Sequence, residues 1–367
     1  MQDYAFVRGG ITTGDSLRFR RYFWEQTASN DRFYYQQSTV KSDGDYTGRE
    51  LCILWHGGEG ELNWYAENAG ATIAGREAWN NKGIAITYTG SLRTTLYSGN
   101  LCENVICVLI PREEKWLAPL WSFCNSNVFE QSVRSVNQKL SVDVRYFEKA
   151  PIDISEWLQT TFQEYPHGLP SPYSNNATQW IFHGHPCASV VWDDEQKWTV
   201  HGSLRTDASV LQVAVARLLG YRWPAEEDTE MELADEQRGW VNCCETLLPY
   251  ADEDGIVCIP PVRGERSADD RLLNLLAAAY GEAWSNDVLA ELLKNADHSG
   301  KTLETWLRDK FFAQHCKLFQ SRPFIWHIWD GLRDGFSALI NYHKLDRKNL
   351  ETLIYTYLGD WISRQKQ

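Results

Sequence analysis

Hydrophobic side chains in the first part of the chain fall in short runs that Gly, Asn, Thr and Pro interrupt. Such runs between turn residues are typical of β-strands. Three of them are predicted to be strands, at residues 51–55, 83–88 and 105–110. Residues 139–147 alternate between apolar and polar positions and predict a further strand, whereas helical spacing predicts helices over 116–124 and 128–136. Residues 1–150 are therefore expected to form one α+β domain with a mixed sheet.

Apolar residues recur at helical spacing through most of the second half of the chain. Helices are predicted, in chain order, over residues 154–163, 204–219, 269–280, 287–295, 302–312 and 346–361. Residues 151–203 hold five prolines and predict a wrapping connection. Residues 204–367 are predicted to form a mainly helical C-terminal domain, and the acidic stretch near 225–237 predicts a solvated, mobile insertion within it.

The distribution of charge decides whether nucleic acid is a plausible partner. The chain has 367 residues and a formal net charge of −13, which by itself disfavours DNA. Residues 1–152, however, contain 16 Lys and Arg against 17 Asp and Glu, whereas the rest of the chain contains 20 against 32. Because phosphate contacts depend on charge within roughly 8–10 Å, the nearly neutral first half can present a local basic face.

The cysteines and the N-terminal residues indicate the compartment. Nine cysteines lie in or near apolar runs, with no Cys-x-x-Cys pair, which predicts reduced thiols rather than disulfides or a structural zinc site. The first residues lack the basic start and apolar run of a signal peptide, and no run approaches the roughly 18 apolar residues of a membrane span. We expect a cytoplasmic protein with no membrane partner and no bound metal.

The Gly- and Thr-rich residues 9–21 are the first candidate for a DNA contact. Glycine and threonine permit close approach to a phosphate, and arginine donates to phosphate oxygens through a planar fork. The residues assigned to this contact are Thr13, Arg18, Arg20 and Arg21. The alternative is a glycine-rich turn that opens a domain, with its arginines in solvent.

Two further segments, residues 79–97 and residues 131–140, concentrate hydrogen-bond donors. Arginine suits guanine edges, and asparagine or glutamine suits adenine edges, so these residue types fit the reading of bases in a groove. The candidates in the two segments are Lys82, Thr87, Tyr88, Ser91, Arg93, Thr94, Tyr97, Arg134, Gln138 and Lys139. The alternatives are a plain polar hairpin and a polar helix end.

No segment has the pattern of a catalytic centre. His327, Asp330 and Ser337 are residue types that a hydrolase uses, but the serine lacks the Gly-x-Ser-x-Gly turn of an activated nucleophile. Buried aromatic rings around hydrogen-bonded His and Asp are the alternative. The His-Gly-His-Pro-Cys run at 183–187 lacks a fourth metal ligand. A glycine loop for a nucleoside cofactor and the (Asn/Asp/Ser)-Pro-Pro-aromatic turn of amino-methyltransferases are also missing from the sequence.

Several blocks together resemble one family. Residues 10–19, with Gly-Ile-Thr-Thr-Gly-Asp followed by Arg-Phe, resemble the start of the region downstream of the catalytic domain in adenine-specific DNA methyltransferases of the type IIG and BREX kinds. Residues 57–59 and 64–65 resemble that family's Lys-Gly-Gly-Glu and Trp-Tyr element, with His56 in place of the lysine. Further blocks resemble the family in the same order, at residues 83–97, 123–147, 217–224, 255–257 and 322–345.

This resemblance implies a DNA sequence-recognition module in a restriction–modification or phage-defence system. Residues 1–150 would be the target-recognition-like domain, with double-stranded DNA as partner. The family's catalytic domain, which uses S-adenosylmethionine, has no counterpart in the chain, so the chain is expected to bind no cofactor, to lack catalytic residues and to act with a separate methyltransferase domain or subunit. The alternatives are a protein–protein adaptor that docks a methyltransferase and a hydrolase that uses the His327 segment.

Overall fold

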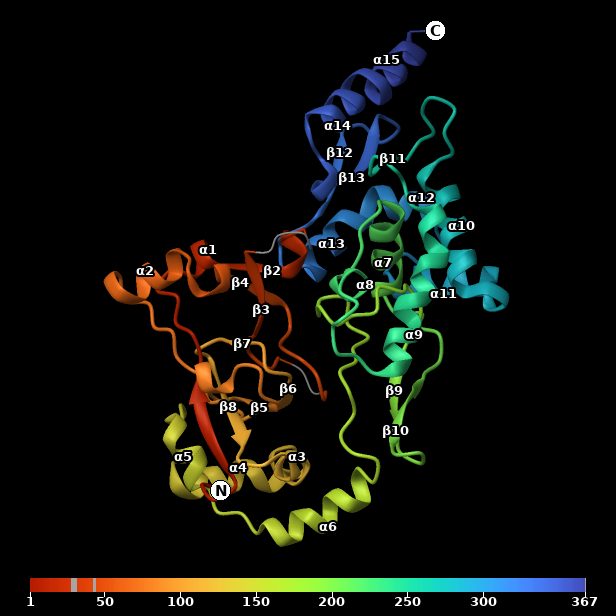
Figure 1. The fold of residues 1–367 in the computed structure, drawn as a ribbon. Helices are drawn as coiled ribbons and strands as arrows, with labels where there is room; N and C mark the ends of the chain where they lie inside the picture. Colours follow the sequence, from red (N-terminus) through yellow and green to blue (C-terminus); the bar gives the residue numbers. More distant parts are fainter. Residues whose placement is uncertain (28–31, 42–43, 367) are drawn as a thin grey trace. The chain divides into compact units, whose positions relative to one another are not determined.

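The computed structural model describes residues 1–27, 32–41 and 44–366, which divide into two compact units. Unit 1 comprises Met1–Ser174, Gln179–Ile181 and Trp192–Val200; unit 2 comprises Asn175–Thr178, Phe182–Val191 and His201–Gln367. The fold is α+β, as expected, with several small sheets among many helices (Figure 1). None of the helices among the described residues is both long and apolar enough to cross a membrane.

The first sheet of unit 1 is antiparallel and has the strand order β1-β8-β5-β6. Its strands are β1 (Ala5–Gly9), β5 (Gly83–Thr87), β6 (Thr94–Tyr97) and β8 (Ile106–Pro111). Four helices contribute side chains to the core over one face: α3 (Leu117–Cys124), α4 (Asn127–Val136), α5 (Val144–Lys149) and α6 (Ile154–Glu164). Alternate sheet residues such as Ala85 and Val108 belong to a second core on the other face, so both faces of the sheet are buried.

The second sheet of unit 1 has the order β2-β4-β3-β7 and is mixed, because β3 and β7 run parallel. Its strands are β2 (Arg20–Tyr22), β3 (Phe33–Gln37), β4 (Leu51–Leu54) and β7 (Leu101–Cys102). Helices α1 (Ser16–Phe19) and α2 (Glu61–Asn68) lie at this sheet and contribute Phe19 and Leu62 to its core. Short 3-10 turns complete the unit: η1 (Phe23–Glu25), η2 (His56–Gly58), η3 (Arg76–Ala78) and η4 (Glu114–Trp116).

The strand predicted over residues 139–147 is wrong. Only Ser141 makes a strand-like bridge, to Thr89, and the chain then enters α5. The Asp143 side chain accepts the backbone N–H of Arg145 and so caps the helix. Phe147 is fully buried against the first sheet, which means that tertiary packing outweighs the local alternation.

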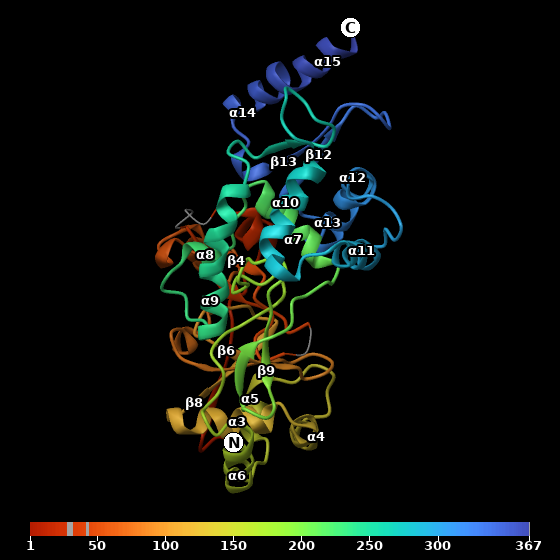
Figure 2. The ribbon, with the colours of Figure 1, turned by 90° about the vertical axis from the view of Figure 1, so that its right-hand side faces the viewer.

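Unit 2 is built around α7 (Ser209–Leu218), in which every residue after Ser209 is buried. Helix α10 (Ala268–Tyr280) packs against α7, as Figure 2 shows, together with the 3-10 turn η5 (Cys244–Tyr250). The remaining helices of this region are α8 (Pro224–Glu227), α9 (Asp235–Cys243), α11 (Asn286–Asn295), α12 (Leu303–Trp306) and α13 (Phe312–Leu318). The 3-10 turn η6 (Gly281–Ala283) precedes α11, and the π-helical segment η7 (Leu307–Phe311) joins α12 to α13.

Unit 2 also contains an antiparallel sheet of order β11-β13-β12 that was not predicted. Its strands are β11 (Ile256–Cys258), β12 (Ile325–Trp329) and β13 (Ser337–Asn341). The C-terminal helical run packs on one face through Leu353 and Tyr357, and consists of α14 (Arg347–Glu351), η9 (Thr352–Leu358) and α15 (Gly359–Gln365), after the turn η8 (Tyr342–Lys344). A separate two-stranded sheet consists of β9 (Val190–Asp193) and β10 (Trp198–His201).

The acidic stretch near 225–237 is exposed at Glu227, Glu230, Glu232 and Asp235, but part of it is packed into the fold, which the sequence did not predict. It forms α8 and the start of α9, and Gln237 is fully buried. The Glu226 side chain is only 3% exposed and lies 2.8 Å from Arg217, whose side chain is equally buried. A buried guanidinium needs a carboxylate partner, and the local charge pattern cannot reveal a requirement that arises elsewhere in the chain.

The nine cysteines are free thiols, and seven of them are buried, as the sequence predicts. Cys243 is exposed and Cys316 is half-buried. Burial raises the pKa of the Cys102 and Cys187 thiols to about 12. These side chains therefore act as small apolar groups in the core.

Candidate nucleic-acid interface

Two of the three predicted DNA segments meet in unit 1. The turn between β5 and β6 (residues 88–93) pairs with the loop between α4 and α5 (residues 137–142), and we call these two loops together the tip. The N–H of Val142 donates to the Tyr88 carbonyl at 2.8 Å, and the N–H of Gly90 donates to the Leu140 carbonyl at 3.1 Å. Backbone hydrogen bonds between loops some fifty residues apart hold the tip in one conformation, whereas neither loop alone forms a ladder.

Arg134 joins the two loops through its side chain. Its guanidinium donates to the Gly90 carbonyl at 2.6 Å and to the Lys139 carbonyl, and its Nε lies 3.4 Å from Glu130 one helical turn away. These contacts occupy the donors of the arginine with acceptors of the protein itself. The structure therefore gives Arg134 a positioning role within the tip, and its predicted contact with DNA stays a prediction.

The tip presents hydrogen-bond donors to solvent, and its nearest acidic residue is Asp143, which follows the second loop, caps α5, pairs with Arg145 and interacts electrostatically with Lys139. Residues 78–102 and 131–142 contain neither Asp nor Glu. The exposed candidates are Lys82, Ser91, Arg93, Gln138 and Lys139, with Lys82 at the opposite end of β5 from the tip. Arg93 also donates to the Lys41 carbonyl, which anchors one side of its guanidinium. A donor-rich surface with few carboxylates favours phosphate oxygens and the acceptor atoms of base edges.

The other candidates of the hairpin hold the tip from inside. Tyr97 is buried and donates to the Asn100 carbonyl, and Tyr88 donates to the Asn104 carbonyl. Burial raises the pKa of both phenols. The Thr94 hydroxyl donates to the Cys124 carbonyl at 3.3 Å, and the Thr87 hydroxyl is buried without a hydrogen-bond partner. The hydrogen bonds of Tyr88, Thr94 and Tyr97 therefore hold the β5–β6 hairpin to neighbouring backbone.

The first predicted segment lies at the second sheet of unit 1. Arg18 pairs with Glu61 on α2 and donates to the Tyr65 hydroxyl at 3.0 Å, and its side chain remains 44% exposed. The hydrogen bond to Glu61 raises the pKa of Arg18 further. Arg21 donates to the carbonyl oxygens of Leu17 and Arg20.

Arg20 and Thr13 are more enclosed than the sequence suggests. The guanidinium of Arg20 forms an ion pair with Glu103, which also accepts a hydrogen bond from Ser38, and donates to the Ile11 carbonyl at 3.1 Å. Burial lowers the pKa of Arg20 from its ordinary value, and Glu103 opposes that effect. Thr13 is buried and lies within hydrogen-bond distance of Ser16. A DNA contact through Arg20 would require this pair to open.

Of the three residues in the hydrolase alternative, only His327 and Ser337 contact each other. His327 Nε2 and Ser337 Oγ lie 2.7 Å apart across β12 and β13, but Asp330 accepts the backbone N–H groups of Leu332 and Phe336 and so caps the turn between the strands. Ser337 is 4% exposed, and burial lowers the pKa of His327. A catalytic serine needs an accessible oxygen and an oriented base, so the geometry favours a structural cross-strand pair.

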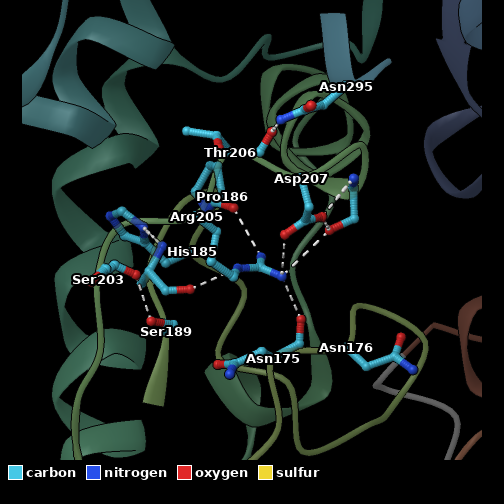
Figure 3. Close-up of polar contacts among 12 residues, drawn as sticks. Asn175, Asn176, His185, Pro186, Ser189, Ser203, Arg205, Thr206, Asp207 and Asn295 are labelled. Atoms are coloured by element: carbon cyan, nitrogen blue, oxygen red, sulfur yellow. Dashed lines mark hydrogen bonds and ion pairs between the residues drawn. The ribbon is translucent and has the colours of Figure 1, made fainter. Parts of the chain in front are cut away.

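Unit 2 contains a largely enclosed arginine, Arg205, that no sequence pattern marks as a candidate (Figure 3). The guanidinium of Arg205 donates to the carbonyl oxygens of Asn175, Pro186 and Ala188 at 2.6, 3.0 and 2.9 Å, and it lies 3.4 Å from Asp207. Burial lowers the pKa of Arg205, with Asp207 opposing the effect. One side chain thus joins its own segment to two stretches of irregular backbone, at residue 175 and at residues 186–188.

The His-Gly-His-Pro-Cys run belongs to the same buried region. His185 Nδ1 accepts the N–H of Ala188 at 3.2 Å, and His183 Nδ1 accepts the N–H of His185 at 3.0 Å. Burial lowers the pKa of His185 to about 3. Within residues 1–27, 32–41 and 44–366, no three His, Cys, Asp or Glu side chains are grouped to hold a metal ion.

Unit 2 has a pocket of about 280 Å³ beside α8 and α9. Two arginines line it, but Arg222 donates to the Glu226 carbonyl at 3.2 Å and Arg238 donates to the Met231 carbonyl at 2.6 Å. Glu245 lines the same pocket. Both arginines of the pocket thus donate to backbone carbonyls, and a carboxylate lies in the same pocket. The pocket is therefore less suited than the tip to binding an anion.

Comparison with known proteins relates the chain to one class of enzyme, the adenine-specific methyltransferases. One similar protein is the adenine-specific methyltransferase PglX of Lacticaseibacillus casei (strain Zhang), which is 31% identical over 119 residues. The match covers 31% of this chain and 10% of PglX, so the chain spans about a tenth of the length of the curated relative it matches. No protein-family model matches the chain.

Proposed function

We propose that the chain recognises a sequence in double-stranded DNA for an adenine-specific methyltransferase of the BREX or type IIG kind. A separate catalytic domain or subunit would bind S-adenosylmethionine and transfer the methyl group. The observation that carries this proposal is the tip, in which two donor-rich segments without acidic residues meet and are held by backbone hydrogen bonds. The similarity to PglX supports the methyltransferase setting.

The exposed donors of the tip suit the major groove, where each base pair presents a distinct set of donors and acceptors. Because β5 also pairs with β8 and both faces of that sheet are buried, only the β5–β6 turn and the α4–α5 loop would enter the groove. Ser91 in the first loop and Gln138 in the second are exposed neutral donors. Arg93 and Lys139 would contact phosphates beside the groove. Because the two loops are already fixed to each other, little conformational entropy is lost on binding.

The remaining candidates divide into peripheral contacts and support. Lys82, Arg18 and Arg21 are accessible enough to contact flanking phosphates. The buried or half-buried candidates would act by holding the exposed ones in place; these are Thr13, Arg20, Thr87, Tyr88, Thr94, Tyr97 and Arg134.

Selection from randomised duplexes tests the proposal directly. The full chain, alone and with a cognate methyltransferase subunit, is incubated with the library, and bound duplexes are sequenced. We expect one enriched motif, bound at least about a thousandfold more tightly than random duplex. Failure to bind DNA, together with tight binding to the methyltransferase subunit, would instead establish the adaptor alternative.

The salt dependence of binding tests the phosphate contacts at the tip. Replacing Arg93 and Lys139 by Gln should reduce the slope of log affinity against log salt by about 2, because each phosphate contact contributes roughly 0.9. Lys115→Gln is the matched control, since Lys115 is exposed in the same unit and paired with Glu113. An unchanged slope in the double variant would remove these two contacts.

A further inference from the structure

Leu140 lies within the tip, surrounded by polar residues, yet its side chain is 72% exposed. Its backbone is fixed, because its carbonyl accepts the N–H of Gly90 at 3.1 Å. The preceding residue is tied as well, since the N–H of Lys139 donates to Asn137 Oδ1 at 2.9 Å. Two residues further on, Val142 is buried in the core of the first sheet. Leu140 is therefore held outward by an anchored loop.

The surroundings of Leu140 distinguish it from an ordinary exposed leucine. Isolated surface leucines are common and need no explanation. Leu140, however, has exposed Gln138 and Lys139 directly before it, and Ser91 follows the glycine that its carbonyl binds. One apolar group among outward-facing donors matches the donor and acceptor pattern of a thymine in the major groove, where a methyl group lies next to the O4 acceptor.

We propose that Leu140 reads a thymine through apolar contact with the 5-methyl group, while a neighbouring donor of the tip binds O4. This inference rests on the proposed function and makes it specific, because it names a base and the residue that recognises it. The Leu140 side chain has no hydrogen-bonding group, so its residue type alone does not indicate a base contact.

Exchange of thymine for uracil tests the contact, because the two bases differ only by the methyl group. In the duplex that the chain selects, each thymine is replaced by uracil in turn, and affinity is measured by fluorescence anisotropy. At one position we expect a loss of about fourfold, which corresponds to the roughly 0.8 kcal/mol for burial of one methyl-sized group. Leu140→Ala should lower the affinity for the thymine duplex by about tenfold and remove the difference between thymine and uracil.

Two further variants separate recognition from folding. Leu140→Met keeps an apolar side chain and should retain the uracil penalty. Leu332→Ala is the matched control, since Leu332 is a 67% exposed leucine in a turn of unit 2, and it should change neither the affinity nor the penalty. Thermal unfolding of all three variants should match that of the unaltered chain, because the replaced side chains are exposed.

The possible failures are distinguishable. If the chain selects a DNA motif but no uracil exchange weakens binding, or Leu140→Ala keeps the same penalty, the thymine contact is wrong and the proposed function stands. A selected motif without any thymine has the same consequence. If no duplex is bound, both proposals fail. If Leu140→Ala weakens only the binding of a methyltransferase subunit, the tip is a protein-docking surface and the thymine contact is overturned.

Discussion

The tip of unit 1 and the β12–β13 hairpin of unit 2 contain similar kinds of polar residues and use them in opposite ways. In the tip, backbone groups and Arg134 make the internal bonds, and the side chains of Ser91 and Gln138 stay exposed. In the β12–β13 hairpin, Asp330 caps its own turn and His327 pairs with the buried Ser337. Residue types that suggest a site therefore identify one only where the polar groups remain unused by the fold.

The largest expected effect is on the free energy of unfolding and comes from a buried ion pair of unit 2. Glu226→Ala leaves the buried Arg217 without its carboxylate, and loss of one partner of a buried ion pair costs about 3–5 kcal/mol. Urea unfolding of the full chain measures the change. Glu227→Ala, at the exposed neighbouring position, should stay within about 0.5 kcal/mol. Equal effects of the two variants would mean that Glu226 does not act as the buried partner of Arg217.

The next effect is a pH dependence in unit 2. Burial lowers the pKa of His315 to about 3. In the folded chain its Nε2 accepts the N–H of Ile325, and its Nδ1 lies 3.2 Å from Gln212 Oε1. The unfolded chain binds the proton near pH 6.5, so stability is complete above that pH and falls as the pH decreases towards about 3. At pH 5 the loss from this group is about 2 kcal/mol.

A variant isolates that dependence from the other titrating groups. His315→Gln should lower stability at pH 7.5 but show a shallower decline between pH 7 and pH 5 than the unaltered chain. Parallel declines in the two proteins would show that His315 is accessible to protons in the folded state.

A smaller effect sharpens the contrast at the tip. Arg134→Met removes the side chain that joins the two loops, so the exposed donors lose their fixed spacing. We expect DNA affinity to fall by about tenfold, or 1.4 kcal/mol, while most of the fold is kept. Arg145→Met, at an 82% exposed side chain, should change affinity less than twofold. Equal affinities of both variants would show that the tip does not need this connection.

The smallest effect lies in the β12–β13 hairpin. Ser337→Ala removes one hydrogen bond from His327 and should lower the free energy of unfolding by about 1 kcal/mol. DNA affinity should be unchanged. An ester-hydrolysing activity of the chain that this variant abolishes would revive the hydrolase alternative.

Local patterns predicted much of the fold but not its long-range pairings. The runs at 51–55, 83–88 and 105–110 are strands, and the helices expected over 128–136, 154–163 and 269–280 are present. Strands β12 and β13 were missed because exposed Trp326 and Trp329 disguise the alternation of a short hairpin. The helix expected from residue 204 begins only at Ser209, after the irregular segment that Arg205 organises.

In the candidate site, too, local properties could be predicted from the sequence and long-range contacts could not. Residue type and the lack of acidic residues identified the two segments of the tip, and these are local properties. That the two segments meet depends on the pairing of Tyr88 with Val142, which no local pattern encodes. The enclosure of Arg20 depends on Glu103, which is distant in the sequence. Leu140 was missed because exposure, not residue type, marks it.

Photo-crosslinking to DNA tests the central claim most directly. A photoreactive amino acid is placed at Gln138 in one protein and at Leu332 in another, both exposed positions, and each full chain is irradiated with a labelled duplex of the selected sequence. We predict efficient crosslinking from position 138, suppressed by excess unlabelled selected duplex and not by random duplex. Crosslinking from position 332 but not from 138 would contradict the assignment of DNA recognition to the tip.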